Sequence, residues 1–159
     1  MKTEVEEICC PKFDPIPWDD QLVEWDKKLF IKGIVRTFLY LPLNFGKVIT
    51  RLDEQITQAS AQSLDNMCLS DHTSKWKMNI FLAVSKPVFG CENTTISGEF
   101  YSKVFEGDFN NTDKWMKESE KAAELKGYTI QKWYMWYTTC PKCAKKFGKN
   151  YVVIIGQLR

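Results

Sequence analysis

The sequence predicts a single α+β domain made of two βαββ units in tandem, with antiparallel sheets, two helices and a groove between the repeats. A strand–helix–strand order of hydrophobic patterns occurs twice along the chain, at a spacing of about sixty residues. The 159 residues suffice for one core and little more, and the hydrophobic fraction of 44% and charged fraction of 26% are ordinary for a globular domain. A duplicated unit implies a pseudo-two-fold axis, and the place where two halves meet is a natural ligand site.

Changes in hydrophobic period define the expected elements of the first repeat, which spans about 29–88. A segment rich in β-branched and aromatic residues is expected to form a strand. After a turn, apolar residues recur every four positions, which predicts a helix. A polar, loop-like stretch follows, in which 67–69 could form a short strand, and a Trp-led strand ends the repeat. In order, these segments are 30–41, 45–60, 61–73 and 76–84.

The same order recurs in the second repeat, about 94–159. A strand and a glycine-containing turn precede a helix with an apolar side, and Gly127 suits the C-terminal cap of that helix. Two closing strands follow, joined by a loop rich in cysteine and lysine. In order, these segments are a strand at 95–105, a helix at 112–125 and strands at 129–139 and 151–158.

The first 28 residues are expected to form an extended N-terminal arm, and residues 29–159 the domain. Three prolines fall within the seven residues 11–17. Proline removes a backbone donor and restricts the residue before it, so this stretch should run along the surface of the domain without joining a sheet. The aromatic residues expected to hold the arm down are Phe13, Trp18 and Trp25.

Composition argues against several partners. The net charge is +2 and basic residues are spread among acidic ones, so no stripe indicates nucleic acid. The apolar stretches are too short for a membrane span, so no membrane partner is expected. Residues 1–7 are acidic and lack the apolar core of a signal peptide, which favours the cytoplasm. The oligomeric state and any organic cofactor have no signature in the sequence.

Aromatic residues on two strands indicate the ligand site. Residues two apart on a strand share a face, so Trp133, Met135 and Tyr137 should point one way, as should Asn79 and Phe81 in the first repeat. Matching the Trp-led segment 76–81 to 133–137 brings the two sets together at the groove. Rings and a thioether suit a flat, hydrophobic or aromatic small molecule. The alternative is that these five residues are core.

Cysteines carry the sharpest chemical signal. Cys140 and Cys143 form a C-x-x-C turn, which supplies two corners of a tetrahedral zinc site, and Cys9 and Cys10 in the arm could supply the other two. Such a site would be structural. The alternatives are reduced structural thiols and a redox or disulfide pair. The lone histidine, His72, lies in a polar stretch and is expected at the surface.

Several segments resemble the GyrI-like family, whose fold is related to SOUL-like domains. The segment 97–107 with the helix that follows resembles the entry to the family's second repeat, and Tyr137 with Pro141 resembles its Tyr-x-x-x-Pro. The resemblance covers about 29–158. A stand-alone bacterial and archaeal branch, often labelled "hydrolase", is indicated by three further segments: 9–15, 41–46 and 140–146.

The resemblance implies a groove that binds hydrophobic, often cationic, small molecules. In many members a glutamate two residues before the tyrosine faces that groove; here the position holds Met135, and Asn79 is its expected counterpart in the first repeat. Glu99 and Glu106, the nearest acids, are expected to face solvent. The leading function is a stand-alone domain binding a hydrophobic or aromatic small molecule. The alternatives are a hydrolase of strained, cyclopropane-bearing xenobiotics, as some relatives are, and a protein-interaction module.

The cysteine interpretation predicts a measurable metal content. Protein prepared without chelator should contain about one zinc per chain, because four thiolates close a tetrahedral site. Cys143→Ser should lower the melting temperature and loosen residues 1–28, since zinc binding contributes folding free energy. A metal-free protein whose melting temperature does not change with chelator would support the plain-thiol alternative.

Overall fold

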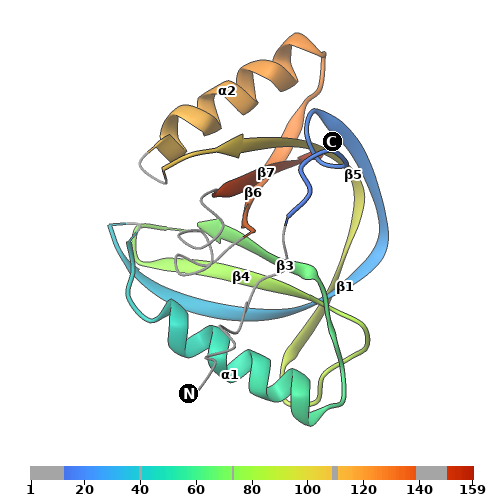
Figure 1. Cartoon of the computed structure of the whole chain (residues 1–159), viewed down its shortest axis with the longest axis vertical. Coiled ribbons are helices and arrows are strands. Elements are labelled where there is room, and N and C mark those ends of the chain that lie inside the picture. Colours follow the sequence, from blue (N-terminus) through green and yellow to red (C-terminus); the bar gives the residue numbers. More distant parts are fainter. Residues whose placement is uncertain (1–12, 40, 73, 109–110, 139–149) are drawn as a thin grey trace, which may run out of the picture.

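The chain forms an antiparallel sheet that closes on itself, with one helix outside each half (Figure 1). The computed structural model describes residues 13–39, 41–72, 74–108, 111–138 and 150–159. The strands in this part of the chain are β1 (Gln21–Phe38), β2 (Leu41–Pro42), β3 (Ser63–His72), β4 (Lys77–Val84), β5 (Glu92–Glu106), β6 (Ile130–Tyr137) and β7 (Tyr151–Leu158), and the helices are α1 (Phe45–Gln58) and α2 (Thr112–Leu125).

The predicted duplication is confirmed. The first unit runs β1-α1-β3-β4 with strand order β1-β4-β3, and the second runs β5-α2-β6-β7 with strand order β5-β7-β6. Two further pairings, β1 with β5 and β3 with β6, join the units. Each of these joins pairs equivalent strands of the two units, as a local two-fold axis requires.

The strand β3 corrects one expectation. Residues 61–73 were expected to be loop-like, yet Ser63–His72 is a strand that pairs with β4 on one edge and with β6 on the other. The strand is polar at many positions, so its hydrophobic pattern is weak, and its place is decided by backbone pairing to both neighbours. Since β3 is the counterpart of β6, and β4 of β7, the predicted match of 76–81 to 133–137 is wrong.

The boundary of the N-terminal arm also shifts. Strand β1 begins at Gln21, and residues 21–25 pair with β5, from Gln21 opposite Ser102 to Trp25 opposite Gly98. A bulge between Trp25 and Lys28 then lets the strand continue, and from Phe30 onward it also pairs with β4. Residues 21–28 therefore belong to the sheet, and only 13–20 of the described arm precede it.

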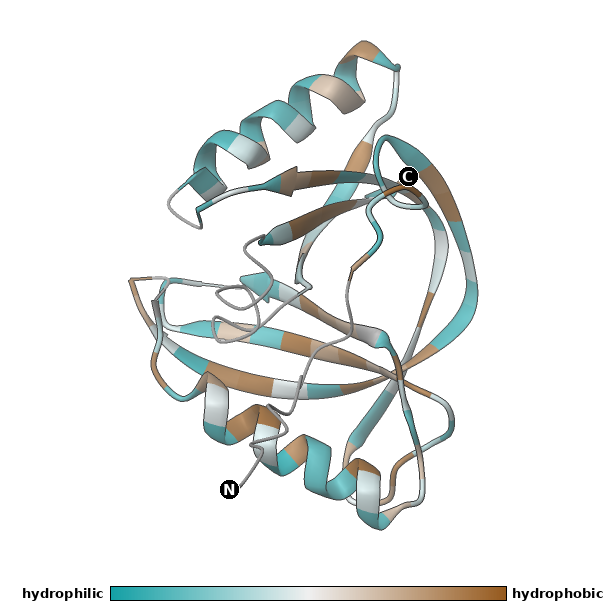
Figure 2. Ribbon diagram, viewed as in Figure 1, coloured by the Kyte–Doolittle hydropathy of each residue, from teal (hydrophilic) through white to brown (hydrophobic). Residues whose placement is uncertain are grey.

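Side chains alternate between the interior of the closed sheet and the two helices. Hydrophobic residues on the outer faces pack under α1 and under α2. In Figure 2 the strands have brown stretches, and both helices include teal turns. Neither described helix is long and apolar enough to cross a membrane. The buried residues of the interior, here called the interior cluster, are Trp25, Phe30, Met67, Leu69, Phe81, Ala83, Ile96, Phe100, Tyr134, Trp136, Val153 and Ile155.

Both helices follow their predicted patterns. Helix α1 buries Val48, Leu52 and Ile56, the residues that recur every four positions. Helix α2 stacks Trp115 on Phe105 of β5, with ring centroids 5.6 Å apart. It ends before Gly127, whose φ of 77° is the left-handed conformation expected at a C-terminal cap.

Close packing of α1 on β1 gives a stability prediction. A Cβ at Gly33 would lie 2.9 Å from Leu52 Cδ1 and 3.1 Å from Val48 Cγ1. Gly33→Ala should therefore destabilise the protein by about 1–3 kcal/mol through overpacking. The control is Gly46→Ala in α1, where nothing lies within 4 Å of the new Cβ; this change should be neutral or stabilising. Urea unfolding of both variants is the measurement, and equal stability would contradict the packing argument.

Candidate functional site

The five residues predicted to line one groove lie on two faces of the sheet. Phe81 is in the interior cluster, and Asn79, two residues earlier on β4, shares its face. Met135 is buried under α2 beside Trp115, and Trp133 and Tyr137 pack against the same cluster. The prediction of one shared surface is therefore wrong. In the run from Trp133 to Tyr137 every residue is apolar or aromatic, so periodicity could not tell which face points inward.

The interior-facing residues of β6 are Tyr134 and Trp136. Trp136 is 2% exposed and lies at the centre of an aromatic group contributed by segments far apart in the sequence. The rings of Phe13 and Trp18 meet it edge-on, at centroid distances of 5.4 and 5.1 Å. Tyr134 meets Phe81 edge-on at 6.0 Å, which links the two repeats through their rings.

The residues that precede β1, 13–20, are here called the N-terminal segment. Two of the three aromatic residues predicted to hold the arm, Phe13 and Trp18, pack against the interior cluster, and the third, Trp25, belongs to it. Phe13 also lies 5.6 Å from the ring of Tyr151. The predicted aromatic contacts are confirmed, and they place two rings of the N-terminal segment against Trp136.

Hydrogen bonds hold the end of the N-terminal segment to β5. Ser102 Oγ donates to the Trp18 carbonyl at 2.5 Å, and Val104 N donates to Asp19 Oδ1 at 3.2 Å. Tyr101 donates its hydroxyl proton to Asp20 Oδ1 at 2.5 Å, and Lys126 Nζ lies 3.2 Å from Asp20 Oδ2.

The protonation states of this attachment follow from its contacts. The hydrogen bond from Tyr101 lowers the pKa of Asp20, although partial burial opposes it. Burial, followed by the contact with Asp20, raises the pKa of Tyr101. Asp20 is therefore charged and Tyr101 neutral near pH 7, so the charge-assisted hydrogen bond between them is kept.

A polar group lies on the interior-facing side of β3, β4 and β6. Asp71 follows Met67 and Leu69 at two-residue spacing and is buried. Lys132 Nζ lies 2.9 Å from Asp71 Oδ2 and 5.1 Å from the centre of the Tyr134 ring. Asn79 is opposite Asp71 in register, and its Oδ1 is buried without a hydrogen-bond partner. Asp71 and Asn79 thus present neighbouring acceptors, of which Asp71 is paired with Lys132.

Protonation near this group has clear causes. Burial lowers the pKa of Lys132, but the hydrogen bond to Asp71 and the neighbouring Tyr134 and Asp71 outweigh it, so the pKa is raised overall. Burial raises the pKa of Tyr134, with Lys132 opposing. Lys132 is therefore a cation and Tyr134 a neutral phenol near pH 7.

Asp71 is the interior carboxylate that sequence reasoning missed. The expected positions, Met135 and Asn79, carry none, and Asp71 lay in a stretch interpreted as loop-like. The alternation of Met67, Leu69 and Asp71 on a single strand face was the available signal. Glu99 and Glu106, the acids expected to face solvent, are exposed.

The proposed zinc ligands Cys9, Cys10, Cys140 and Cys143 lie outside the described residues, so that site stays a prediction. Within the described ranges, no three His, Cys, Asp or Glu side chains come together as a metal site. Burial raises the pKa of Cys68 to about 12, which leaves it a thiol. Cys91 donates to Gln55 Oε1 at 3.2 Å. Neither cysteine is therefore suited to act as a nucleophile.

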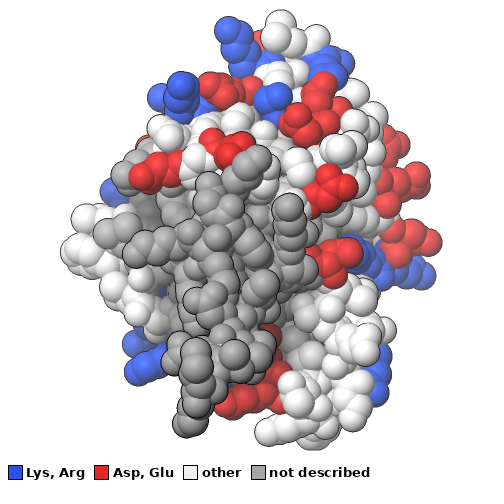
Figure 3. All heavy atoms as spheres, viewed as in Figure 1, with Lys and Arg blue, Asp and Glu red and all other residues white. Residues whose placement is uncertain are grey.

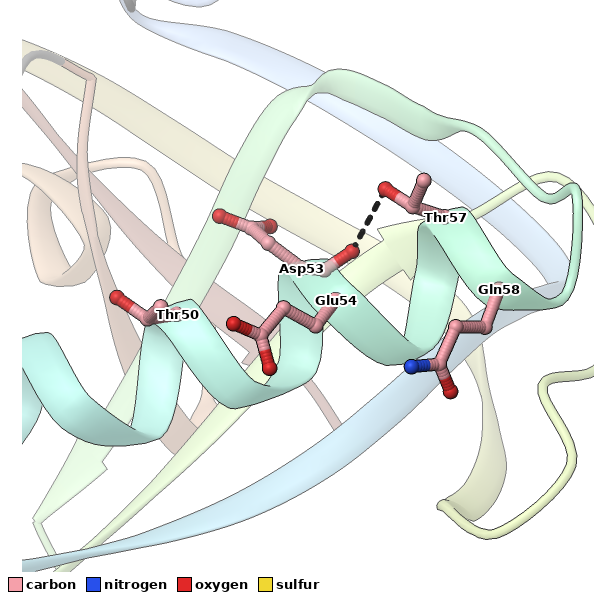
Figure 4. A pocket seen from close by; sticks show the side chains of 5 residues that line it. All are labelled: Thr50, Asp53, Glu54, Thr57 and Gln58. Carbon is pink, nitrogen blue, oxygen red and sulfur yellow. Dashed lines mark hydrogen bonds between the residues drawn. The ribbon is translucent and has the colours of Figure 1, made fainter.

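A shallow depression on α1 is a weaker candidate (Figure 4). Its described lining residues all come from this one helix: Thr50, Asp53, Glu54, Thr57 and Gln58. Both threonine hydroxyls donate to carbonyls of their own helix, Thr50 to Gly46 at 2.8 Å and Thr57 to Asp53 at 3.0 Å. Partial burial raises the pKa of Asp53. The depression thus offers little that is free to bind, and the interior cluster is the better site.

Comparisons with known proteins agree with this fold. Seven chains of solved structures are similar, among them SAV2435 bound to tetraphenylphosphonium. That structure has a TM-score of 0.52 and 14% sequence identity, and the alignment covers 87% of this chain and 93% of the other. At this identity the likeness shows a shared fold alone. No curated protein matches the chain. The model of the family described as "Bacterial hydrolase" matches residues 1–158, and the chain therefore belongs to that family.

Proposed function

We propose that this chain is a GyrI-like domain that binds a hydrophobic, aromatic small molecule between its two repeats. The observation that carries the proposal is the aromatic surroundings of Trp136, to which both repeats and the N-terminal segment contribute. Aromatic rings bury large areas and pair edge-on, so they suit a ligand with several rings. The tetraphenylphosphonium bound by the structurally similar SAV2435 is a ligand of this kind and supports the proposal.

The N-terminal segment would compete with such a ligand. Phe13 and Trp18 already occupy the edge-on positions around Trp136. A ligand that uses this surface must take their place, and each aromatic pair it breaks costs about 0.5–1.5 kcal/mol beyond the area exposed. The bonds from β5 to Trp18, Asp19 and Asp20 would keep the segment attached when its rings move aside.

The polar group beside Tyr134 would select the charge of the ligand. Lys132 is the sole described side chain bridged to Asp71, and it is 42% exposed while Asp71 is 12% exposed. The lysine side chain can therefore swing into water while the carboxylate stays inside. A cationic ligand could then take the place of the Lys132 ammonium group beside Asp71. A neutral ligand of the same shape that displaced the ammonium group would leave the Asp71 carboxylate unpaired.

Competition by the N-terminal segment predicts a gain of affinity. Phe13→Ala should tighten the binding of tetraphenylphosphonium by about fivefold, because one ring pair with Trp136 no longer has to be broken. The matched control is Phe89→Ala, since Phe89 is 99% exposed and contacts neither the segment nor the interior cluster. Isothermal titration is the measurement. Absence of binding to both wild type and Phe13→Ala would contradict the proposed site.

The carboxylate predicts charge discrimination. Asp71→Asn keeps the shape of the side chain and removes its charge, so the affinity for tetraphenylphosphonium should fall by about tenfold while that for neutral triphenylphosphine oxide stays unchanged. Asp65→Asn is the control, because Asp65 lies on the same strand with its side chain 60% exposed. Equal losses for the two ligands would contradict a role of the charge.

Hydrolysis of a strained or reactive xenobiotic is the second candidate function. The family description supports it, as does the grouping of a carboxylate, an ammonium group and a phenol, from Asp71, Lys132 and Tyr134, beside the interior cluster. Tyr137, by contrast, packs toward α2. The Asp71→Asn variant separates the two functions: in a hydrolase, turnover of a cyclopropane-bearing substrate should fall by more than its binding, and in a binding protein no turnover is seen.

A further inference from the structure

Five large apolar side chains are exposed together at one end of the molecule. They come from the end of β1, the residues next to β2 and the turn before β4, which Figure 1 places at the same end. The rings of Phe38 and Trp76 touch, with centroids 5.6 Å apart. This group, here called the apolar tip, consists of Ile34, Phe38, Leu39, Leu43 and Trp76, which are 45%, 53%, 52%, 67% and 57% exposed.

Hydrogen bonds to the buried residue Thr37 hold the backbone next to Trp76 in place. Thr37 is buried, its N donates to the Trp76 carbonyl at 2.9 Å, and its Oγ1 donates to the Lys75 carbonyl at 2.8 Å. Trp76 N in turn donates to Ser74 Oγ at 3.2 Å. The exposed indole is therefore displayed by an ordered turn, and contiguous exposed apolar surface of this kind marks an interaction site.

The backbone beside the tip is not available for strand addition. Arg36 N donates to Asn44 Oδ1 at 2.8 Å, and Leu43 N donates to the Arg36 carbonyl at 2.9 Å. Phe38 and Thr37 pair with β2. Since these bonds occupy the edge of β1, a partner peptide cannot extend the sheet here, and the tip offers side chains alone.

The charged residues of the two segments that carry the tip are basic. Between residues 34 and 51 the charged residues are Arg36, Lys47 and Arg51, and between 72 and 76 the charged residue is Lys75. No acidic residue falls in either range, although the chain has 20 acids among its 159 residues. In Figure 3 this end is mostly white, with blue at its margins and red farther above it. The partner that fits is therefore anionic around an apolar centre.

These features select among the possible occupants. A second copy of the chain would bring two positive rims together in a symmetric contact, which like-charge repulsion opposes. An anionic lipid surface matches both the apolar side chains of the tip and the basic residues around them. Trp and Phe rings are favoured at the level of the lipid headgroups, and leucine reaches the boundary of the acyl chains. Lysine and arginine side chains bind the lipid phosphates. We propose that the apolar tip docks this protein on anionic lipid membranes.

This docking goes beyond the proposed function and does not depend on it. The sequence-based expectation of no membrane partner concerned spanning segments, whereas the tip would lie in the interface. Ile34 is opposite Asn79 in register, so the tip adjoins the polar group of the interior. A hydrophobic ligand dissolved in the membrane would then be close to the proposed site.

Vesicle sedimentation tests the proposal with the full chain. Wild type should pellet with vesicles of phosphatidylglycerol and phosphatidylcholine, and not with phosphatidylcholine alone. Trp76→Ser should weaken binding by about fivefold or more through loss of the inserted ring, and Lys75→Glu should do the same through charge. Phe89→Ser is the matched control, because it removes an exposed ring at the opposite end of β4 and should leave binding unchanged.

Several results would overturn the proposal. The first is that the wild-type protein stays in the supernatant with both vesicle types. The second is that Trp76→Ser and Phe89→Ser lose vesicle binding equally. The third is that the protein forms a dimer in solution, which Trp76→Ser dissociates. Thermal unfolding of each variant shows whether it is folded, and Lys75→Glu keeps the test valid because it leaves the apolar side chains in place. Titration with tetraphenylphosphonium, expected to be unchanged in Trp76→Ser, separates this proposal from the proposed function.

Discussion

Pairing of β1 with strands of both repeats is the constraint on which the rest of the structure depends. A βαββ unit on its own has a sheet with one face under a helix and the other face open to water. The first half of β1 pairs with β5 and its second half with β4, while β3 and β6 join on the other side. The bulge between Trp25 and Lys28 lets one strand serve both partners. Closure turns the two open faces into one interior.

That interior explains why aromatic residues are abundant. Two sheets facing each other leave a volume that neither helix can fill, and bulky rings from both repeats occupy it around Trp136. The N-terminal segment completes the filling with Phe13 and Trp18, and its attachment through Asp20 and Tyr101 relies on a charge-assisted hydrogen bond outside the cluster. The segment is thus held by two kinds of contact, aromatic rings against Trp136 and hydrogen bonds to β5.

A charged group inside such a volume needs a partner of opposite charge, and this explains the contact between Asp71 and Lys132. A buried carboxylate without a partner would cost several kcal/mol. Lysine has a long apolar stem, so it can reach Asp71 across the Tyr134 ring while part of its side chain stays in water. The proposed exchange of Lys132 for a cationic ligand relies on the same flexibility. A rigid arginine in this place would hold the carboxylate more firmly and leave less room for a cation from outside.

Much of the fold could be predicted from the sequence, because helix period, turn residues and capping glycine are local signals. They determined the two helices, the order of strands and the duplication, and the positions of Phe13, Trp18 and Trp25 as apolar contacts. Only the tertiary structure decided which face of β6 points inward, because Trp133 to Tyr137 is apolar on both faces and a shift of one residue exchanges them. It also decided the full length of β3, because backbone pairing with β4 and β6 keeps polar residues such as Asp71 in the strand. No local pattern indicates a pairing partner that lies more than sixty residues away.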